Sequence, residues 1–203
     1  MSFYSIDGVT PVIDRTSYVH PSAVVIGDVI IGKHCYIGPL ASLRGDFGPI
    51  VIEDGVNIQD NCILHSFPDV TVYLEKFAHI GHGATLHGCI IRQGAMIGIG
   101  ATIMDKADVG QQSFVGAHSF VKTADKLPAQ SMIFGTPARV VRPLTEEEMD
   151  WKHRGTEAYM DLARRSLESC VSVKPDNTVS PDRKTLQIKN AVRPKQDEVP
   201  ATF

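Results

Sequence analysis

Histidines are concentrated in one part of the sequence. Three of them lie in HIGHGATLHG at positions 79–88, and His65 lies a short distance before this stretch. Neutral imidazole is a common ligand of zinc and related divalent metals, so the region is a candidate metal site. The spacing alone does not select the ligands, because a strand also carries histidines on its solvent face. The choice depends on how the surrounding chain is folded.

The composition is that of a single globular domain. The chain has 203 residues, 43% of them hydrophobic and 21% charged, with a formal net charge of -3. This length can bury one good core, and the negative charge argues against a nucleic-acid partner. The apolar runs are too short to cross a membrane, and the N-terminus lacks the pattern of a signal peptide. The four cysteines show no metal-binding or disulfide spacing, so we expect a reduced, cytoplasmic protein.

An aliphatic residue recurs at every sixth position through much of the chain. The repeat comprises Val19, Val25, Ile31, Ile37 and Leu43, then Ile52, Ile58 and Leu64, then Ile80 and Leu86, and finally Ile91, Ile97, Ile103, Val109, Val115 and Val121. Most of them are followed four positions later by a small residue. A period of six is typical of a β-solenoid with three short strands per coil, rather than of an amphipathic helix. We therefore predict an all-β parallel β-helix, with the aliphatic side chains inside and the small residues at the corners.

The repeat is interrupted at three places, which lie between Leu43 and Ile52, between Leu64 and Ile80, and between Leu86 and Ile91. The first two gaps hold extra residues, and we expect these to project as loops, where solenoid proteins place functional groups. Counting steps of the repeat puts Leu43, Leu64 and Leu86 on one face of successive coils. The same count puts Ile58 and Ile80 on a different face.

The segment after Val121 leaves the repeat and leads to a predicted helix. Thr145 and Glu148 form the pattern of a capping box, and an amphipathic helix can cover a solenoid. We predict three segments: a β-helix with an N-terminal lead-in at 1–142, a C-terminal helix packing on it at 143–170, and a tail at 171–203. The polar tail is either disordered or packs on a neighbouring subunit.

Two of the histidines are predicted to project from the same face of the solenoid. His65 follows Leu64 and His87 follows Leu86, so both side chains point outward from neighbouring coils. Stacked strands lie about 4.7–4.9 Å apart, and two imidazoles at this spacing can share a zinc ion through bonds of about 2.0–2.1 Å. His82 lies at a corner of another face. It can complete the site if three chains assemble around a threefold axis, and the sites would then lie between subunits.

Other outward positions are predicted to lie near these histidines. Gln59 and Asp60 come one coil before His82, and Arg44 with Asp46 could meet them across the subunit interface. An Arg–Asp pair there would fix the register of the subunits, and Gln59 could hydrogen-bond a metal-bound hydroxide. His79 is expected to be a plain surface residue, and Cys62 and Cys89 are expected to pack inside.

Several stretches resemble a known family. SLRGDFG, NIQDNCILH, HIGHGATLHGCII and GTPAR are similar to the γ-carbonic anhydrase-like family of hexapeptide-repeat, left-handed parallel β-helices, over roughly residues 8 to 165. WKHRGTEAY and NAVRPK are similar to a branch of that family that acts in phenylacetate degradation. The resemblance implies a homotrimer with Zn2+, or another divalent metal such as Fe2+ or Co2+, on His65, His82 and His87. It also implies an interface ion pair of Arg44 with Asp46, a site lined by Gln59 and Asp60, and a catalytic Tyr159 near the metal.

The chain departs from the active carbonic anhydrases of this family at the position of an acidic residue. Phe47 occupies that position, and the loop SFPDVTVYLEK occupies that of a second acidic group. Fast hydration of CO2 must export a proton in every turnover, so these changes disfavour it, whereas Phe47 suits a bulkier acyl substrate.

We therefore rank the functions that the resemblance implies. The first is a metal-dependent thioesterase that hydrolyses acyl-CoA in phenylacetate catabolism through metal-bound hydroxide, and reversible hydration of CO2 or bicarbonate is the second. A hexapeptide acyltransferase without metal and a non-catalytic metal-binding trimer remain as alternatives. Basic residues that could bind the phosphates of coenzyme A are Arg139, Arg142, Lys152 and Arg154.

Overall fold

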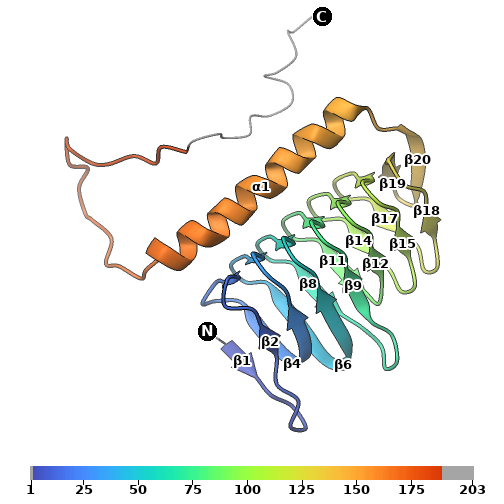
Figure 1. The fold of residues 1–203 in the computed structure, drawn as a ribbon, viewed down its shortest axis with the longest axis horizontal. Coiled ribbons are helices and arrows are strands. Elements are labelled where there is room, and N and C mark those ends of the chain that lie inside the picture. The colour runs from blue at the N-terminus through green and yellow to red at the C-terminus, as the bar shows by residue number, and fades with distance from the viewer. Residues whose placement is uncertain (1, 189–203) are drawn as a thin grey trace, which may run out of the picture.

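Short parallel strands, three to a coil, stack along one axis in the computed structural model, which describes residues 2–188 (Figure 1). The first face, here called the helix face, is one sheet of eight strands. In spatial order these are β3 (Tyr18–Val19), β5 (Tyr36–Ile37), β7 (Asn57–Ile58), β10 (His79–Ile80), β13 (Met96–Ile97), β16 (Phe114–Val115), β19 (Ser131–Gly135) and β20 (Ala138–Pro143). All neighbours are parallel except β20, which returns antiparallel to β19.

The other two faces form one continuous sheet of twelve strands. Two long strands pass from one face to the other, namely β4 (Val24–Ile31) and β6 (Ser42–Ile52). The second face, here called the histidine face, continues with β8 (Ile63–His65), β11 (Thr85–His87), β14 (Thr102–Ile103) and β17 (Phe120–Val121). The third face continues with β9 (Val72–Leu74), β12 (Ile90–Ile91), β15 (Asp108–Val109) and β18 (Lys126–Leu127). Two strands of the lead-in, β1 (Ser2–Tyr4) and β2 (Val12–Ile13), pair with β4.

The six-residue repeat forms the core, as predicted. Every aliphatic residue of the repeat is buried, and none is more than 6% exposed. The small residues at the corners are buried with them, including Cys62 and Cys89. Leu43, Leu64 and Leu86 pair in register on the histidine face, and Ile58 pairs with Ile80 on the helix face. The fold class and the assignment of faces are therefore confirmed.

Two details of the repeat differ from the prediction. Residues 44–49 were expected to form a projecting loop, but they lie within β6. Strand β4 is extended around the same corner, so its backbone pairs with β6 on both sides of a register shift. Gly45 permits the close approach, since a Cβ atom there would lie 2.3 Å from the Asp28 carbonyl oxygen. The six-residue repeat also continues past Val121, within the β-helix predicted for 1–142, because Leu127 and Ile133 pair in register with the coil before them.

The second insertion behaves as expected. Residues 66–71 lie between β8 and β9 and belong to no strand. Phe67 in this loop is 54% exposed. The loop therefore projects at the end of the strand that carries His65.

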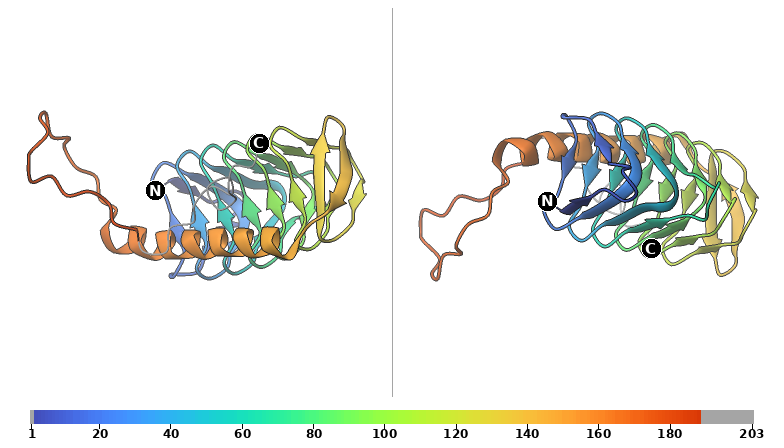
Figure 2. Two further views of the ribbon diagram at one scale, coloured as in Figure 1. Left: turned by 90° about the horizontal axis from the view of Figure 1, so that it is seen from above. Right: turned by 90° about the horizontal axis from the view of Figure 1, so that it is seen from below.

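Helix α1 (Glu146–Ser169) runs back along the helix face toward the first coil (Figure 2). The capping box of Thr145 and Glu148 is present at its start. The helix packs against β3, β5 and β7, with Thr156 and Ala163 buried at the contact. At its far end the Tyr18 hydroxyl lies 3.4 Å from the Cys170 sulfur.

The described part of the tail, residues 171–188, forms no helix or strand and is exposed. The rest of the predicted tail, 189–203, lies outside the described residues. Between residues 2 and 188, no helix is both long and apolar enough to cross a membrane.

The packing of the repeat predicts a large difference between two isoleucines in the same coil. Ile97 is fully buried, whereas Ile99 is 53% exposed. We expect Ile97→Ala to lower the free energy of unfolding by about 2–5 kcal/mol because it leaves a cavity. Ile99→Ala, the matched control, should change it by about 0.5 kcal/mol or less. Denaturant titration of both variants measures this, and equal losses would contradict the assignment of Ile97 to the core.

Candidate functional site

His65 and His87 form a close pair on the histidine face. They end neighbouring strands β8 and β11 and are paired in register. Nδ1 of His65 lies 3.2 Å from Nε2 of His87, and the ring centroids are 5.2 Å apart. The structure thus brings together the two histidines that were predicted to project from consecutive coils.

A carboxylate holds the outer nitrogen of each ring. Nε2 of His65 lies 3.0 Å from Oδ1 of Asp46, and Nδ1 of His87 lies 2.6 Å from Oδ1 of Asp105. An ionised carboxylate only accepts hydrogen bonds, so each outer nitrogen carries the proton of its ring. The inner nitrogens of the neutral rings then present two lone pairs to each other. Such an arrangement favours a shared proton or a cation between the rings.

The pair fits a divalent metal. Two nitrogen ligands at about 2.0–2.1 Å from a tetrahedral zinc ion lie roughly 3.3 Å apart, close to the 3.2 Å between these nitrogens. A histidine ligand that donates its other N–H to a carboxylate is also the usual arrangement around a protein-bound metal. Within residues 2–188 of one chain, however, no group of three His, Cys, Asp or Glu side chains is placed to hold a metal ion.

His82 lies at the corner between the helix face and the histidine face. Its Nδ1 is 2.5 Å from Oδ2 of Asp60, and its side chain is 45% exposed. Asp60 lies one coil before His82, as the repeat predicted. Its carboxylate fixes the His82 ring at an accessible corner.

Two phenylalanines flank the histidine pair. The ring of Phe47 lies 5.5 Å from that of His65, and the ring of Phe67 lies 4.9 Å from that of His87. Both phenylalanines are exposed, so an apolar surface adjoins the imidazoles. Phe47 was singled out in the sequence, whereas Phe67 was not, because its place in the inserted loop depends on how that loop folds.

Asp105 was also missed, although the repeat contains a signal for it. Ile103 pairs with Leu86 in the next coil, and Asp105 follows Ile103 by two positions. Counting one coil beyond His87 reaches Met104, so Asp105, the next residue, could have been predicted to lie near the His87 ring. Arg44, predicted to pair with Asp46, does so within one chain at 2.8 Å while its side chain stays 45% exposed.

Of the two residues predicted to be catalytic, Tyr159 lies on helix α1 and Gln59 lies beneath that helix, directly after β7. The Gln59 amide nitrogen hydrogen-bonds Oδ1 of Asn57 and lies 2.7 Å from Nε2 of His79. The Tyr159 ring packs edge-on against His79 at 5.4 Å. Their catalytic role stays a prediction.

His79 is not the surface residue that was expected. Helix α1 covers it, and its ring lies against Asn57, Gln59 and Tyr159. Burial, with a smaller contribution from the charge of Lys152, lowers its pKa to about 3. The repeat could not reveal this, because the cover comes from a helix more than sixty residues away in the chain.

The basic residues that were suggested to bind the phosphates of coenzyme A lie in different environments. Arg142 donates two hydrogen bonds of 2.8 Å to Glu148, so it supports the start of α1. Arg139 donates to the neighbouring carbonyl of Ala138. Lys152 is not a surface residue, since it is buried between α1 and the solenoid and donates to the Phe77 carbonyl oxygen. These contacts do not support a phosphate site formed by Lys152.

Known proteins resemble this chain in sequence and structure. It is 45% identical over 195 residues to the carnitine operon protein CaiE of Proteus sp. (strain LE138), covering 96% of this chain and 99% of that protein. A putative acetyltransferase from Bacillus cereus has a TM-score of 0.81 and 34% identity, covering 82% of this chain and 97% of that chain. A hexapeptide transferase family protein from Anaplasma phagocytophilum has a TM-score of 0.78 and 34% identity, over 81% and 97% of the two chains. No protein-family model matches the chain.

These relatives support a left-handed β-helix of hexapeptide repeats and correct the predicted function. The expected activity was a metal-dependent thioesterase of phenylacetate catabolism. That prediction is contradicted, because the relatives are named for a carnitine operon and the solved structures are described as transferases. The resemblance had assigned a chemistry from metal-ligand motifs, and such motifs do not fix the reaction that a site performs.

The burial of His79 predicts unusual titration behaviour. An ordinary histidine has a pKa near 6.5, whereas that of His79 is lowered to about 3 by burial. We expect its ring signals in a 1H–13C NMR titration to stay constant from pH 8 to about pH 5. Signals that move with a midpoint near pH 6.5 would contradict the enclosed position of the ring.

The same lowered pKa predicts a loss of stability in acid. Between about pH 6.5 and pH 3 the unfolded chain binds the proton that folded His79 excludes, so stability falls as the pH falls. The contribution is about 1.4 kcal/mol per pH unit within that window. His79→Gln removes this contribution, and denaturant titrations over the window should show a shallower pH dependence than for the unchanged protein. Identical slopes for the two proteins would contradict this prediction.

Proposed function

Because this chain belongs to the CaiE family of left-handed hexapeptide-repeat β-helices, we propose that it is an enzyme that transfers an acyl group from a coenzyme A thioester to a small acceptor. Two structures with 34% identity are described as a putative acetyltransferase and as a hexapeptide transferase family protein, which supports acyl transfer. The proposed centre is the pair of His65 and His87. The relatives' name makes carnitine a first acceptor to test.

The observation that carries the proposal is the convergence of two imidazole lone pairs beside an apolar surface. Nδ1 of His65 and Nε2 of His87 face each other at 3.2 Å, and Phe47 and Phe67 stand next to the rings. A divalent cation held by His65 and His87 of one subunit and His82 of the next would act as a Lewis acid toward the thioester carbonyl. Zn2+ is the first candidate, and Fe2+ or Co2+ would suit the same ligands.

The chain's own residues would position the rings and the substrate. Asp46 and Asp105 fix which nitrogen of each imidazole carries the proton. Phe47 and Phe67 would exclude water from the acyl chain. In the reaction the nucleophilic oxygen or nitrogen of the acceptor forms a bond to the carbonyl carbon and loses a proton. The carbon–sulfur bond breaks, and coenzyme A leaves as the thiol after taking up a proton.

We also propose that the chain forms a homotrimer with one such centre at each interface. The support is that, within residues 2–188 of one chain, the imidazoles of His65 and His87 converge, while His82 is held by Asp60 at a partly exposed corner. Gln59 lies on the helix face that leads to this corner, and Tyr159 on α1 packs against His79 of the same face. They are therefore candidates to approach the centre from the neighbouring subunit.

The carboxylate behind His87 predicts a graded loss of function. Asp105→Asn should weaken zinc binding and acyl transfer by about 10–100-fold, because the His87 ring loses the acceptor that orients it. The control is Asp161→Asn on the outer surface of α1, where the carboxylate is 47% exposed. Metal content is measured by mass spectrometry, and transfer is measured as coenzyme A release with and without acceptor. Asp105→Asn with unchanged metal content and rate would contradict the proposed centre.

The acceptor-free reaction and CO2 hydration are measured in the same series. Release of coenzyme A at equal rates with and without acceptor would overturn acyl transfer. CO2 hydration without acyl transfer would instead favour the activity that the resemblance to γ-carbonic anhydrase-like proteins implies. His87→Ala should abolish every metal-dependent rate, whereas His118→Ala, at an exposed position, should leave the rates unchanged.

The shared centre predicts that two inactive variants restore activity together. His82→Ala and His87→Ala damage opposite sides of an interface, so some interfaces in mixed trimers have all three histidines. Random mixing in equal amounts leaves about a quarter of the interfaces complete. We expect co-expression to restore about that fraction of the activity, while each variant alone is inactive. No restoration in mixed trimers that are verified by mass spectrometry would contradict a centre shared between subunits.

A further inference from the structure

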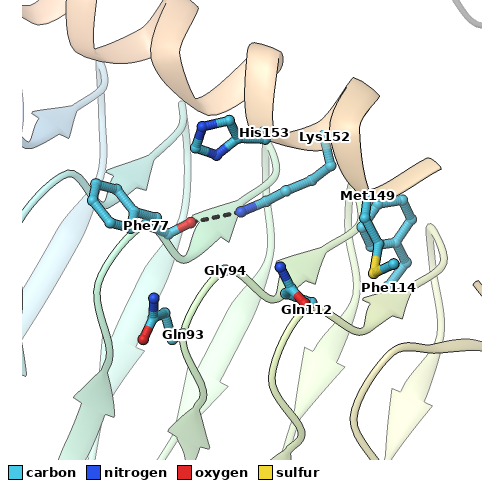
Figure 3. A pocket seen from close by; sticks show the side chains of 8 residues that line it. All are labelled: Phe77, Gln93, Gly94, Gln112, Phe114, Met149, Lys152 and His153. Carbon is cyan, nitrogen blue, oxygen red and sulfur yellow. Dashed lines mark hydrogen bonds between the residues drawn. The ribbon is translucent and has the colours of Figure 1, made fainter. Parts of the chain in front are cut away.

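A cavity lies between helix α1 and the helix face, away from the histidine pair (Figure 3). Its volume is about 180 Å³. Its apolar wall is formed by Phe77, Phe114 and Met149, and its polar wall includes Gln93, Gln112 and Lys152. These residues come from α1 and from three neighbouring coils.

Lys152 presents a buried amine to this cavity. Only 5% of the residue is exposed, and its Nζ donates to the Phe77 carbonyl oxygen at 2.7 Å. That acceptor is neutral, so the contact does not compensate a positive charge. Burial lowers the Lys152 pKa to about 7, because the enclosed ammonium group loses its contact with water. An ammonium group has three donors, and the bond to Phe77 uses one of them.

Gln112 adds a second donor on the same side. Its Oε1 accepts a hydrogen bond from Nε2 of Gln130 at 3.2 Å, which leaves its amide nitrogen available to the cavity. Figure 3 shows this nitrogen directed toward the Lys152 amine. Gly94 keeps the space between them open, because a Cβ atom there would lie 3.4 Å from Cγ of Gln112 and 3.8 Å from Nζ of Lys152. Two donors without a side chain between them select a ligand rich in acceptors.

We propose that this cavity binds a small monocarboxylic acid, with its carboxylate on Lys152 and Gln112 and its hydrocarbon part against Phe77, Phe114 and Met149. A carboxylate accepts from both donors and supplies the negative charge that the buried ammonium lacks. The three apolar side chains remove the hydrocarbon part from water. The site is on a different face from His65 and His87, so the proposal does not depend on the proposed acyl transfer.

Calorimetric titration of the full chain with butyrate tests the proposal. Butyramide has the same hydrocarbon part without the charge, and n-butylamine carries the opposite charge. We expect saturable binding of butyrate, at least about tenfold tighter than that of butyramide, and no binding of n-butylamine. Equal binding of butyrate and butyramide, or no saturable binding of butyrate, would overturn the proposal.

Variants then locate the bound acid. Lys152→Met keeps most of the side-chain volume and removes the amine, and Gln112→Glu replaces a donor with a negative charge. Each should weaken butyrate binding at least about tenfold, whereas Lys33→Met, at an exposed lysine, should not change it. If circular dichroism shows that Lys152→Met does not fold, Gln112→Glu decides the result. Unchanged affinity in a folded Lys152→Met or in Gln112→Glu would overturn the assignment of the site.

Discussion

The parallel register of the coils is the constraint on which the rest of the structure depends. Each inward aliphatic lies directly above its counterpart in the coil below, as Leu43, Leu64 and Leu86 do. A shift of one residue would move the buried side chains of a strand to the solvent face, so burial of these side chains fixes the register strongly. The residues that directly follow two paired inward residues are therefore also neighbours on adjacent coils. His65 and His87 meet because the leucines before them are locked in place.

The repeat therefore predicts much of the fold and part of the site. Its inward residues identify the core, and the alternation of strands identifies the two projecting histidines. What it misses depends on contacts outside the repeat. The repeat does not show that α1 packs Tyr159 against His79 and buries Lys152. Phe67 approaches His87 only through the fold of the inserted loop. The strand through residues 44–49 was not predicted, because inserted residues were expected to leave the sheet. They remain paired because β4, in the preceding coil, is also long enough to follow them.

The chemistry was harder to predict than the geometry. The ligand motifs led to the histidine pair, but the same motifs suggested a thioesterase, which the carnitine operon relatives and the transferase structures contradict. A pair of imidazoles held by carboxylates can serve several reactions, because the substrate is chosen by the surfaces around it. In the proposed centre those surfaces would be Phe47, Phe67 and residues of a neighbouring subunit. We therefore expect the surroundings of the pair to specify the reaction more than the pair does.

Helix α1 affects the cooperativity with which the solenoid unfolds. Stacked repeats contact only their neighbours, so a bare solenoid can fray from either end, coil by coil. Here the helix spans the stack, from the Phe77 carbonyl oxygen held by Lys152 to Tyr18 beside Cys170. If the first coil unfolds, it loses its contact with α1, and α1 is also held by a later coil through Lys152 and Phe77. The helix therefore links the stability of coils that do not touch each other. The helix thus favours all-or-none unfolding in an architecture whose nearest-neighbour contacts alone would favour gradual loss.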